Sequence, residues 1–448
     1  MKYQSQSVAL PYFVGALVIF ALQLVFGLIG ATMYVAPNLI PTDILPFSVV
    51  RMIHTNALIV WLLLGFFGSA FYLLPEETES ELYSPMLARV QFWVFFVAAV
   101  VIVVGYLFGV YDGRSYLEQP LYLKVGIVVV ALMFLYNCSL TVLRGRRTVI
   151  TSILLLGLWG IAVFFLFAFY DPANVVLDKM FWWWVVHLWV EAVWELVMAS
   201  ILAFLLIKLT GVDREVTEKW LYVIIGLALF SGILGTAHHY YWIGTPGYWQ
   251  WLGSIFGSLE PLPFFAMVLF AFAMVWKGQR QHPNYAALLW SLGCAVASFF
   301  GAGVLGFLHN LAPINYYSHG TQITAAHGHL AFFGAYAMVN LAMISYAMPP
   351  LLGRAPYNQW LNVISFWLMT TGVGVMTSAL LFAGVLQTHL EHVLGQDYMD
   401  VQQQLTLFYW IRLVGGGITA IALALFMIAI LAPGRRVAPA ASEFAPAE

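Results

Sequence analysis

The stretch MFWWWVVHLWVEAVWELVMASILAFLLIK covers residues 180–208 and carries the features on which the fold prediction depends. It is apolar over more than the roughly 20 residues that an α-helix needs to cross a bilayer. Besides Lys208 at its end, three ionisable side chains lie in its interior, at His187, Glu191 and Glu195. An ionisable side chain in hydrocarbon costs roughly 3 kcal/mol or more, so each of them needs a partner or a purpose. The stretch therefore predicts a transmembrane helix with a functional polar site.

The composition of the whole chain points the same way. Of its 448 residues 62% are hydrophobic and only 8% are charged, whereas soluble domains have about 25% charged residues. So few charges cannot make a water-facing surface, which excludes soluble, disordered and nucleic-acid-binding proteins. The formal net charge of −2 carries no information about partners. We expect an integral membrane protein.

Apolar runs of this length recur along the chain, separated by short polar or Pro/Gly-containing breaks. They predict an all-α polytopic membrane protein, one catalytic domain over residues 1–448 with a disordered tail at about 437–448. The first apolar stretch is too long for the core of a signal peptide, so we interpret it as an uncleaved span. The predicted helices are twelve: 10–36, 48–74, 88–111, 121–143, 148–170, 180–208, 218–243, 251–276, 285–310, 322–348, 358–388 and 404–432.

The distribution of lysine and arginine predicts the orientation. With the N-terminus inside, five of the 18 basic residues fall on or near the outer face and the other thirteen inside. Cytoplasmic loops carry the excess of basic residues, so both termini should be cytoplasmic. The five outer residues are Arg51, Arg114, Lys124, Lys179 and Arg412.

Six histidines from four predicted helices then lie at one depth, in the outer third of the membrane. One such histidine is most simply a hydrogen-bonded imidazole, but six at one level indicate metal centres, because imidazole is the commonest transition-metal ligand. The six are His54, His187, His238, His239, His327 and His329.

Helical geometry divides these histidines among centres. His327 and His329 are two residues apart, about 200° around a helix, so they face opposite sides and can each hold a different haem. His54 with one of them would make a saturated bis-histidine haem, and the other would support a five-coordinate haem. The three histidines of the sixth and seventh helices would hold a non-haem metal opposite its open face.

Five sequence motifs, in four of which these histidines lie, resemble those of the haem–copper oxidase superfamily, and more narrowly those of the catalytic subunits of cytochrome c-dependent nitric oxide reductases. The resemblance extends over essentially the whole chain, and the motifs are highly specific when taken together. They are WWVVHLWVEAVWE at 183–195, GTAHHYYW at 235–242, TAAHGH at 324–329, MIHTN at 52–56 and EPLP at 260–263.

The resemblance implies the role of each ligand. His329 and His54 match the axial ligands of a low-spin haem b, and His327 matches the proximal ligand of a high-spin haem b. The non-haem iron ligands that match are His187, His238, His239 and Glu191. Three imidazoles with a carboxylate form a harder site than three imidazoles alone, which favours iron over Cu(I).

Three further carboxylates receive expected roles. Glu195 follows Glu191 by one helical turn and Glu260 precedes a Pro-Leu-Pro kink, so each is either a protonated buried carboxyl or part of proton delivery to the site. Glu118, in the outer segment Tyr-Leu-Glu-Gln-Pro, matches a family glutamate that binds calcium near the haem propionates.

The implied reaction is the reduction of two nitric oxide molecules to nitrous oxide and water, with electrons passing from a cytochrome c through the low-spin haem. The quinol-fed members are longer at the N-terminus, so we expect a separate membrane-anchored cytochrome c subunit on the periplasmic face near Glu118. Protons should also come from the periplasmic side. The expected location is the bacterial cytoplasmic membrane, in a denitrifying respiratory chain.

Two alternatives remain open. A terminal oxidase reducing O2 would need a tyrosine beside the metal, but the sixth helix has Glu191 where such relatives carry it. On the seventh helix, where other oxidases carry the tyrosine, Tyr222 lies 16 residues before His238. This is about 24 Å along a helix axis, so Tyr222 cannot reach the metal. A secondary transporter would use its intramembrane charges to bind substrate ions and would contain no haem.

Overall fold

A computed structural model describes residues 1–278, 282–355 and 359–432. The expected disordered tail and three of the basic residues counted above, Arg280, Arg435 and Arg436, lie outside these ranges. Within them twelve helical spans are long and apolar enough to cross a membrane, which confirms the predicted number. The spans are Gln4–Val35, Phe47–Thr78, Pro85–Leu107, Leu121–Arg144, Val149–Phe169, Val175–Thr210, Arg214–Tyr240, Tyr248–Trp276, Tyr285–Asn310, Gln322–Leu351, Gln359–Val393 and Thr406–Leu431.

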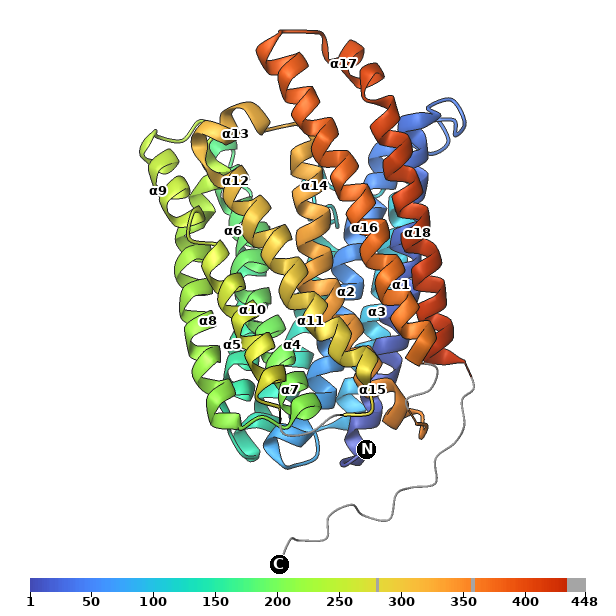
Figure 1. Cartoon of the computed structure of the whole chain (residues 1–448), viewed down its shortest axis with the longest axis vertical. Coiled ribbons are helices and arrows are strands. Elements are labelled where there is room, and N and C mark those ends of the chain that lie inside the picture. The colour runs from blue at the N-terminus through green and yellow to red at the C-terminus, as the bar shows by residue number, and fades with distance from the viewer. Residues whose placement is uncertain (279–281, 356–358, 433–448) are drawn as a thin grey trace, which may run out of the picture.

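Most spans consist of more than one helical element (Figure 1). The elements in chain order are η1 (Gln4–Val8), α1 (Ala9–Val35), α2 (Phe47–Thr78), α3 (Pro85–Leu107), α4 (Leu121–Arg144), α5 (Val149–Phe165), η2 (Leu166–Phe169), α6 (Val175–Leu188), η3 (Trp189–Val193), α7 (Trp194–Thr210), α8 (Arg214–Gly235), η4 (Thr236–Tyr240), α9 (Tyr248–Gly257), α10 (Pro261–Trp276), α11 (Tyr285–Ser298), η5 (Phe299–Leu305), α12 (Gly306–Asn310), α13 (Ala312–Ser318), α14 (Gln322–Ala331), η6 (Phe332–Ala337), α15 (Met338–Leu351), α16 (Gln359–Gln387), η7 (Thr388–Val393), α17 (Tyr398–Gln404) and α18 (Thr406–Leu431).

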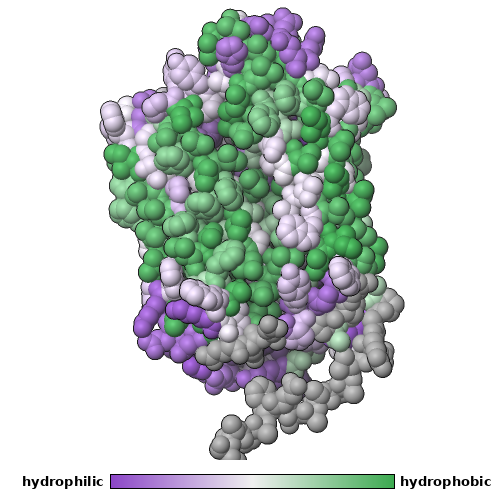
Figure 2. Space-filling model, viewed as in Figure 1, coloured by the Kyte–Doolittle hydropathy of each residue, from purple (hydrophilic) through white to green (hydrophobic). Residues whose placement is uncertain are grey.

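The surface of the bundle is an apolar belt between two polar ends. Figure 2 shows hydrophobic residues over the middle of the molecule and hydrophilic residues gathered at both ends. Large apolar side chains lie exposed on this belt, among them Val97 and Val101 of α3 and Phe230 of α8. Such a belt is stable in hydrocarbon and not in water, as expected of a multi-pass membrane protein.

Three spans form the centre of the bundle. The most apolar windows of α2, of α6 to α7 and of α14 to α15 are 83%, 83% and 78% buried, whereas those of the other spans are 33–44% buried. The six histidines predicted to bind metals lie on these three spans or on η4, which follows α8. The polar site therefore lies in the interior, away from lipid.

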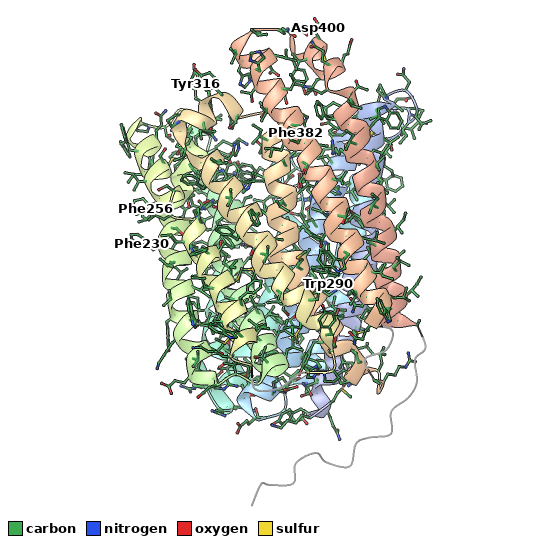
Figure 3. The ribbon with its side chains drawn as sticks, viewed as in Figure 1. Phe230, Phe256, Trp290, Tyr316, Phe382 and Asp400 are labelled. Atoms are coloured by element: carbon green, nitrogen blue, oxygen red, sulfur yellow. The ribbon has the colours of Figure 1, made fainter. Side chains whose placement is uncertain are left out.

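The two ends of the bundle differ in what they carry. The N-terminus and the last residues of α18 lie at one end, and α9, α13 and α17 lie at the other (Figure 1). Tyr316 and Asp400, labelled in Figure 3, mark this second end. Twelve crossings place both termini on the same side, as predicted.

The prediction of an uninterrupted helix at 180–208 is wrong in one respect. The π-helical segment η3 separates α6 from α7, and Glu191 within it has φ −110° and ψ 17°. Two further π-helical segments, η5 and η6, interrupt the spans that pack beside it. Short π segments of this kind occur frequently at functional sites, because they redirect side chains and release backbone carbonyls.

Candidate metal and haem centre

Four side chains from three elements converge in the interior. Ligand atoms of His187 (α6), Glu191 (η3), His238 and His239 (η4) all lie within 4.8 Å of one another. His187 Nδ1 lies 3.5 Å from Glu191 Oε2, and His238 Nε2 lies 3.9 Å from the same oxygen. The structure thus brings together the four residues that the sequence analysis assigned to a non-haem metal.

Local backbone geometry explains how these residues meet. His238 and His239 lie on the short 3-10 segment η4, which ends the span of α8 and turns both rings inward, with centroids 4.9 Å from that of His187. The His239 ring also stacks on Trp183, with centroids 3.6 Å apart. A ring N–H of His187 donates to the Gly232 carbonyl at 2.8 Å, which fixes the ring orientation and leaves Nδ1 available.

The buried atoms of this cluster indicate a cation. Among the described residues, no N–H or O–H group donates to His187 Nδ1 or to Glu191 Oε2. A buried polar atom without a partner costs about 1–3 kcal/mol. Imidazole nitrogens and carboxylate oxygens that gather in this way are compensated by a metal ion, whose usual ligands they are. The donor set therefore fits a transition metal.

A second site lies between α2 and α14. The rings of His54 and His329 are nearly parallel, with centroids 6.2 Å apart and an interplanar angle of 29°. Since a metal–imidazole bond is about 2 Å long, this separation accommodates one metal atom between them. Each Nδ1 bonds a backbone carbonyl, that of Gln23 for His54 (2.8 Å) and that of Ala325 for His329 (2.7 Å). Both Nε2 atoms therefore remain for axial ligation.

The space around this histidine pair fits a large ligand. A cavity of about 640 Å³ includes both rings and extends between α1, α2, α14, α16 and α18. Its lining is mainly apolar, with the two arginines Arg51 and Arg412 among the polar residues. An apolar cavity with two facing imidazoles and two cationic groups fits a porphyrin that carries carboxylates.

His327 faces a different neighbourhood from His329, as the two-residue spacing predicts. Its Nδ1 bonds the carbonyl of Gly301 in η5 at 3.0 Å, which leaves Nε2 for a metal. The ring of His309 lies 6.2 Å away, but both nitrogens of His309 contact side-chain hydroxyls. His327 is therefore the better placed of the two for axial ligation.

Two further carboxyls lie beside the metal cluster. Glu195 on α7 is 5% exposed, and Glu260, which precedes α10, is 6% exposed. Glu260 Oε1 lies 3.4 Å from Nδ1 of His238, and Glu260 Oε2 accepts from Asn310. Glu260 therefore lies directly against the metal cluster and is held there by Asn310.

Glu118 lies in the outer loop before α4, away from the histidine cluster but close to α2. It is buried, and Asn56 Nδ2 donates to its carboxylate at 2.8 Å. Burial raises the pKa of the Glu118 carboxyl, and the bond from Asn56 offsets only part of this rise. A buried carboxylate is a ligand that hard cations such as Ca²⁺ prefer. The partner of Glu118, Asn56, lies two residues after His54 on α2, so a cation here would be close to the His54 site.

The sequence analysis missed residues that complete the site. Asn310 binds Glu260, and its only sequence signal is its place directly after His309. Gly232 lies against the π segment, where a Cβ would stand 1.7 Å from the Glu191 carbonyl oxygen. Only glycine allows this approach, and nothing in the surrounding residues indicates it.

Comparisons with known proteins show the family and the fold. The family model described as cytochrome c and quinol oxidase polypeptide I matches residues 7–418. A nitric oxide reductase subunit of Stutzerimonas stutzeri is 54% identical, over 97% of this chain and 96% of that protein. A cytochrome c oxidase subunit 1 homolog of Agrobacterium tumefaciens is 25% identical, over 87% and 76%. A solved haem–copper terminal oxidase dimer shares the fold, with a TM-score of 0.78 at 15% identity over 96% of this chain and 85% of that one.

Proposed function

Because the chain belongs to the cytochrome c and quinol oxidase polypeptide I family, and within it to the nitric oxide reductases, we propose that it reduces nitric oxide at a haem b and non-haem iron pair. The enzyme is an oxidoreductase of the bacterial membrane. Two nitric oxide molecules, two electrons and two protons give nitrous oxide and water. When bound, the haems and the iron supply the electron-transfer and nitrogen–nitrogen coupling chemistry.

The observation that carries the proposal is the carboxylate at the metal cluster. Glu191 lies beside His187 and His238 and adds an anionic oxygen to the imidazole ligands. A site made of imidazoles alone would have no such ligand. A harder donor set of this kind favours iron over Cu(I). The residues His187, His238, His239 and Glu191 would hold this iron.

The remaining histidines support the two haems. The facing pair His54 and His329 would saturate a low-spin haem b, which suits it to electron transfer alone. His327, on the opposite side of α14, would be the proximal ligand of the high-spin haem b. Electrons would enter from a membrane-anchored cytochrome c subunit that docks on the outer face, close to the cavity of the His54 pair.

Carboxyls of this chain would handle the protons. Glu260 lies against the proposed iron ligand His238, and the buried Glu195 lies one turn beyond Glu191, on α7. Glu260 supports proton delivery from the outer side, since it follows α9 in the chain and lies against His238 of η4 at that end. Glu195 would hold a proton on the other side of Glu191. At the outer end the carboxylate of Glu118 would bind calcium and tie the outer loop to α2.

The rival activity is oxygen reduction. A tyrosine at the metal would favour it, but Tyr222 of α8 is 63% exposed on the lipid-facing surface. Nitric oxide and oxygen consumption measured on the same purified complex, with a reduced cytochrome c donor, separate the two. We expect nitric oxide turnover to exceed oxygen turnover at least tenfold. Faster oxygen consumption would assign the chain to the oxidases.

A further inference from the structure

Tyr336 makes a contact that the function described above does not use. It belongs to the π segment η6, on the same span as His327 and His329, and its hydroxyl donates to the carbonyl of Val190 in η3. The bond joins two π segments that are distant in sequence. It therefore links the span that carries the haem histidines to the segment that carries Glu191.

The acceptor is free because of the π segment itself. In a regular α-helix the N–H of Trp194 would donate to the Val190 carbonyl, four residues earlier. Here the Trp194 N–H donates instead to Trp189, five residues earlier. The Val190 carbonyl thus loses its helical donor in the bundle interior, where such a group needs another partner. The hydroxyl of Tyr336 supplies it.

Packing holds the donor in place. Tyr336 is 4% exposed, and its ring is surrounded by other aromatic rings. The ring of Trp194 lies edge-on at 5.3 Å, and those of Phe332 and Phe66 lie at 5.9 and 6.2 Å. A phenol enclosed in this way has little freedom to turn from the carbonyl.

The bond from Tyr336 to the Val190 carbonyl constrains the next residue in the chain, Glu191. Val190 is bonded to Glu191, whose backbone is non-helical and whose own carbonyl rests against Gly232. The backbone is therefore held on both sides of the carboxylate. We propose that Tyr336 is a positioning residue for Glu191: its hydroxyl maintains the π segment that aims this carboxylate at the metal. The proposal rests on the iron site assigned above.

Loss of the hydroxyl has a defined consequence. The Val190 carbonyl would then recover a donor only if η3 returned to regular α-helical bonding, which would rotate Glu191 relative to His187. The metal would keep its three imidazoles and lose an optimally placed carboxylate. Partners that orient metal ligands affect metal affinity by about 10- to 100-fold when removed.

The test is Tyr336→Phe in the full complex, with Tyr346→Phe as the matched control. Tyr346 is an aromatic-packed tyrosine on the same span, with its ring 6.1 Å from those of Tyr72 and Phe204. Two readouts are compared: the rate at which ferrozine extracts non-haem ferrous iron, and the Mössbauer doublet of that iron after ⁵⁷Fe enrichment. We expect extraction to accelerate at least tenfold in Tyr336→Phe and the doublet to change, with both haem spectra unchanged.

Each outcome bears on the proposal. Wild-type extraction rate and doublet in Tyr336→Phe would overturn it, as would equal effects in Tyr346→Phe. If Tyr336→Phe does not accumulate, 4-fluorophenylalanine at position 336 keeps nearly the size of tyrosine but cannot donate a hydrogen bond, and an unchanged extraction rate and doublet there would also overturn the proposal. Absence of non-haem iron from the wild-type complex would instead contradict the proposed function.

Discussion

At the residue scale, the side chains that carry the chemistry could be predicted from the sequence because their identity is decisive. Histidine and glutamate are so rare in apolar spans that their mere presence at positions 187, 191 and 195 marks a site. The spacing of His327 and His329 further predicted that they serve different neighbours, and the structure confirms that their rings bond different carbonyls.

Two other residues of the site carried no such signal. Buried tyrosines and asparagines usually serve packing and helix contacts, so Tyr336 and Asn310 look ordinary in the sequence. Their importance follows from their partners, the Val190 carbonyl and the Glu260 carboxyl, which only the folded chain brings to them.

The proposed proton role of Glu195 predicts a kinetic defect without loss of cofactors. In Glu195→Ala, nitric oxide turnover should fall at least 100-fold, the usual range for loss of a proton-transfer group, while both haem spectra remain. Glu215→Gln is the control, because this carboxylate is 73% exposed and paired with Lys219. Activity of Glu195→Ala within a few-fold of wild type would remove Glu195 from the mechanism.

The proposed calcium site makes a prediction about metal content. Glu118→Gln keeps the shape of the side chain and removes its charge, so bound calcium should fall from about one per complex to near zero. Calcium is measured by atomic emission after gel filtration in calcium-free buffer. Asp171→Asn, an outer-loop carboxylate that is 87% exposed, should retain calcium. Equal calcium in wild type and Glu118→Gln would exclude this residue as a ligand.

At the element scale, the number of spans followed from hydropathy, whereas their exact limits and internal breaks did not. Residues 189–193 are ordinary apolar helix residues around Glu191, and no proline or glycine marks the π segment. Its cause is tertiary: Gly232 of α8 admits the displaced backbone, and Tyr336 bonds the released carbonyl. Interactions of this kind depend on which helices are neighbours, which a single sequence does not give.

The close approach of α8 to η3 can be tested with two glycines of the same helix. Gly232→Ala puts a methyl group 1.7 Å from the Glu191 carbonyl oxygen, whereas an added Cβ at Gly226 meets nothing within 4 Å. Overpacking costs about 1–3 kcal/mol or more, so Gly232→Ala should lose non-haem iron and nitric oxide turnover. Gly226→Ala should keep both. Iron and haem assays on the two purified variants check this, and wild-type iron content in Gly232→Ala would contradict the assigned contact.

At the scale of the whole molecule, the site lies towards one end, and ion pairs lie at both ends; on the side of the site Arg114 pairs with Asp178 and Lys124 with Asp112. At the end that holds the N-terminus, Arg214 donates to both oxygens of Glu77 at 2.7 and 2.8 Å, and Lys208 pairs with Glu76. These carboxylates of α2 are engaged in structural pairs. They are therefore poorly suited to carry protons from that side towards Glu191.

The proposed periplasmic entry of electrons and protons predicts that turnover does not charge the membrane. Both electrons and protons should reach the site from the periplasmic side. In proteoliposomes in which the periplasmic face of the complex is exposed to the external medium, nitric oxide reduction should raise the pH of that medium. The pH of the lumen should stay unchanged. A pH dye trapped inside reports the lumen, with an uncoupler as the control for leakage. Luminal alkalinisation during turnover would require a proton route from the cytoplasmic end.

The central claim is that three histidines and Glu191 hold an iron that is not part of a haem. Total iron, haem b and copper per chain, measured on the purified wild-type complex and on His238→Ala, test it most directly. After subtraction of the partner's haem iron, we predict three irons and two haems b in wild type with negligible copper, and two irons with the same two haems b in His238→Ala. Stoichiometric copper, or iron equal to haem in the wild type, would contradict the account.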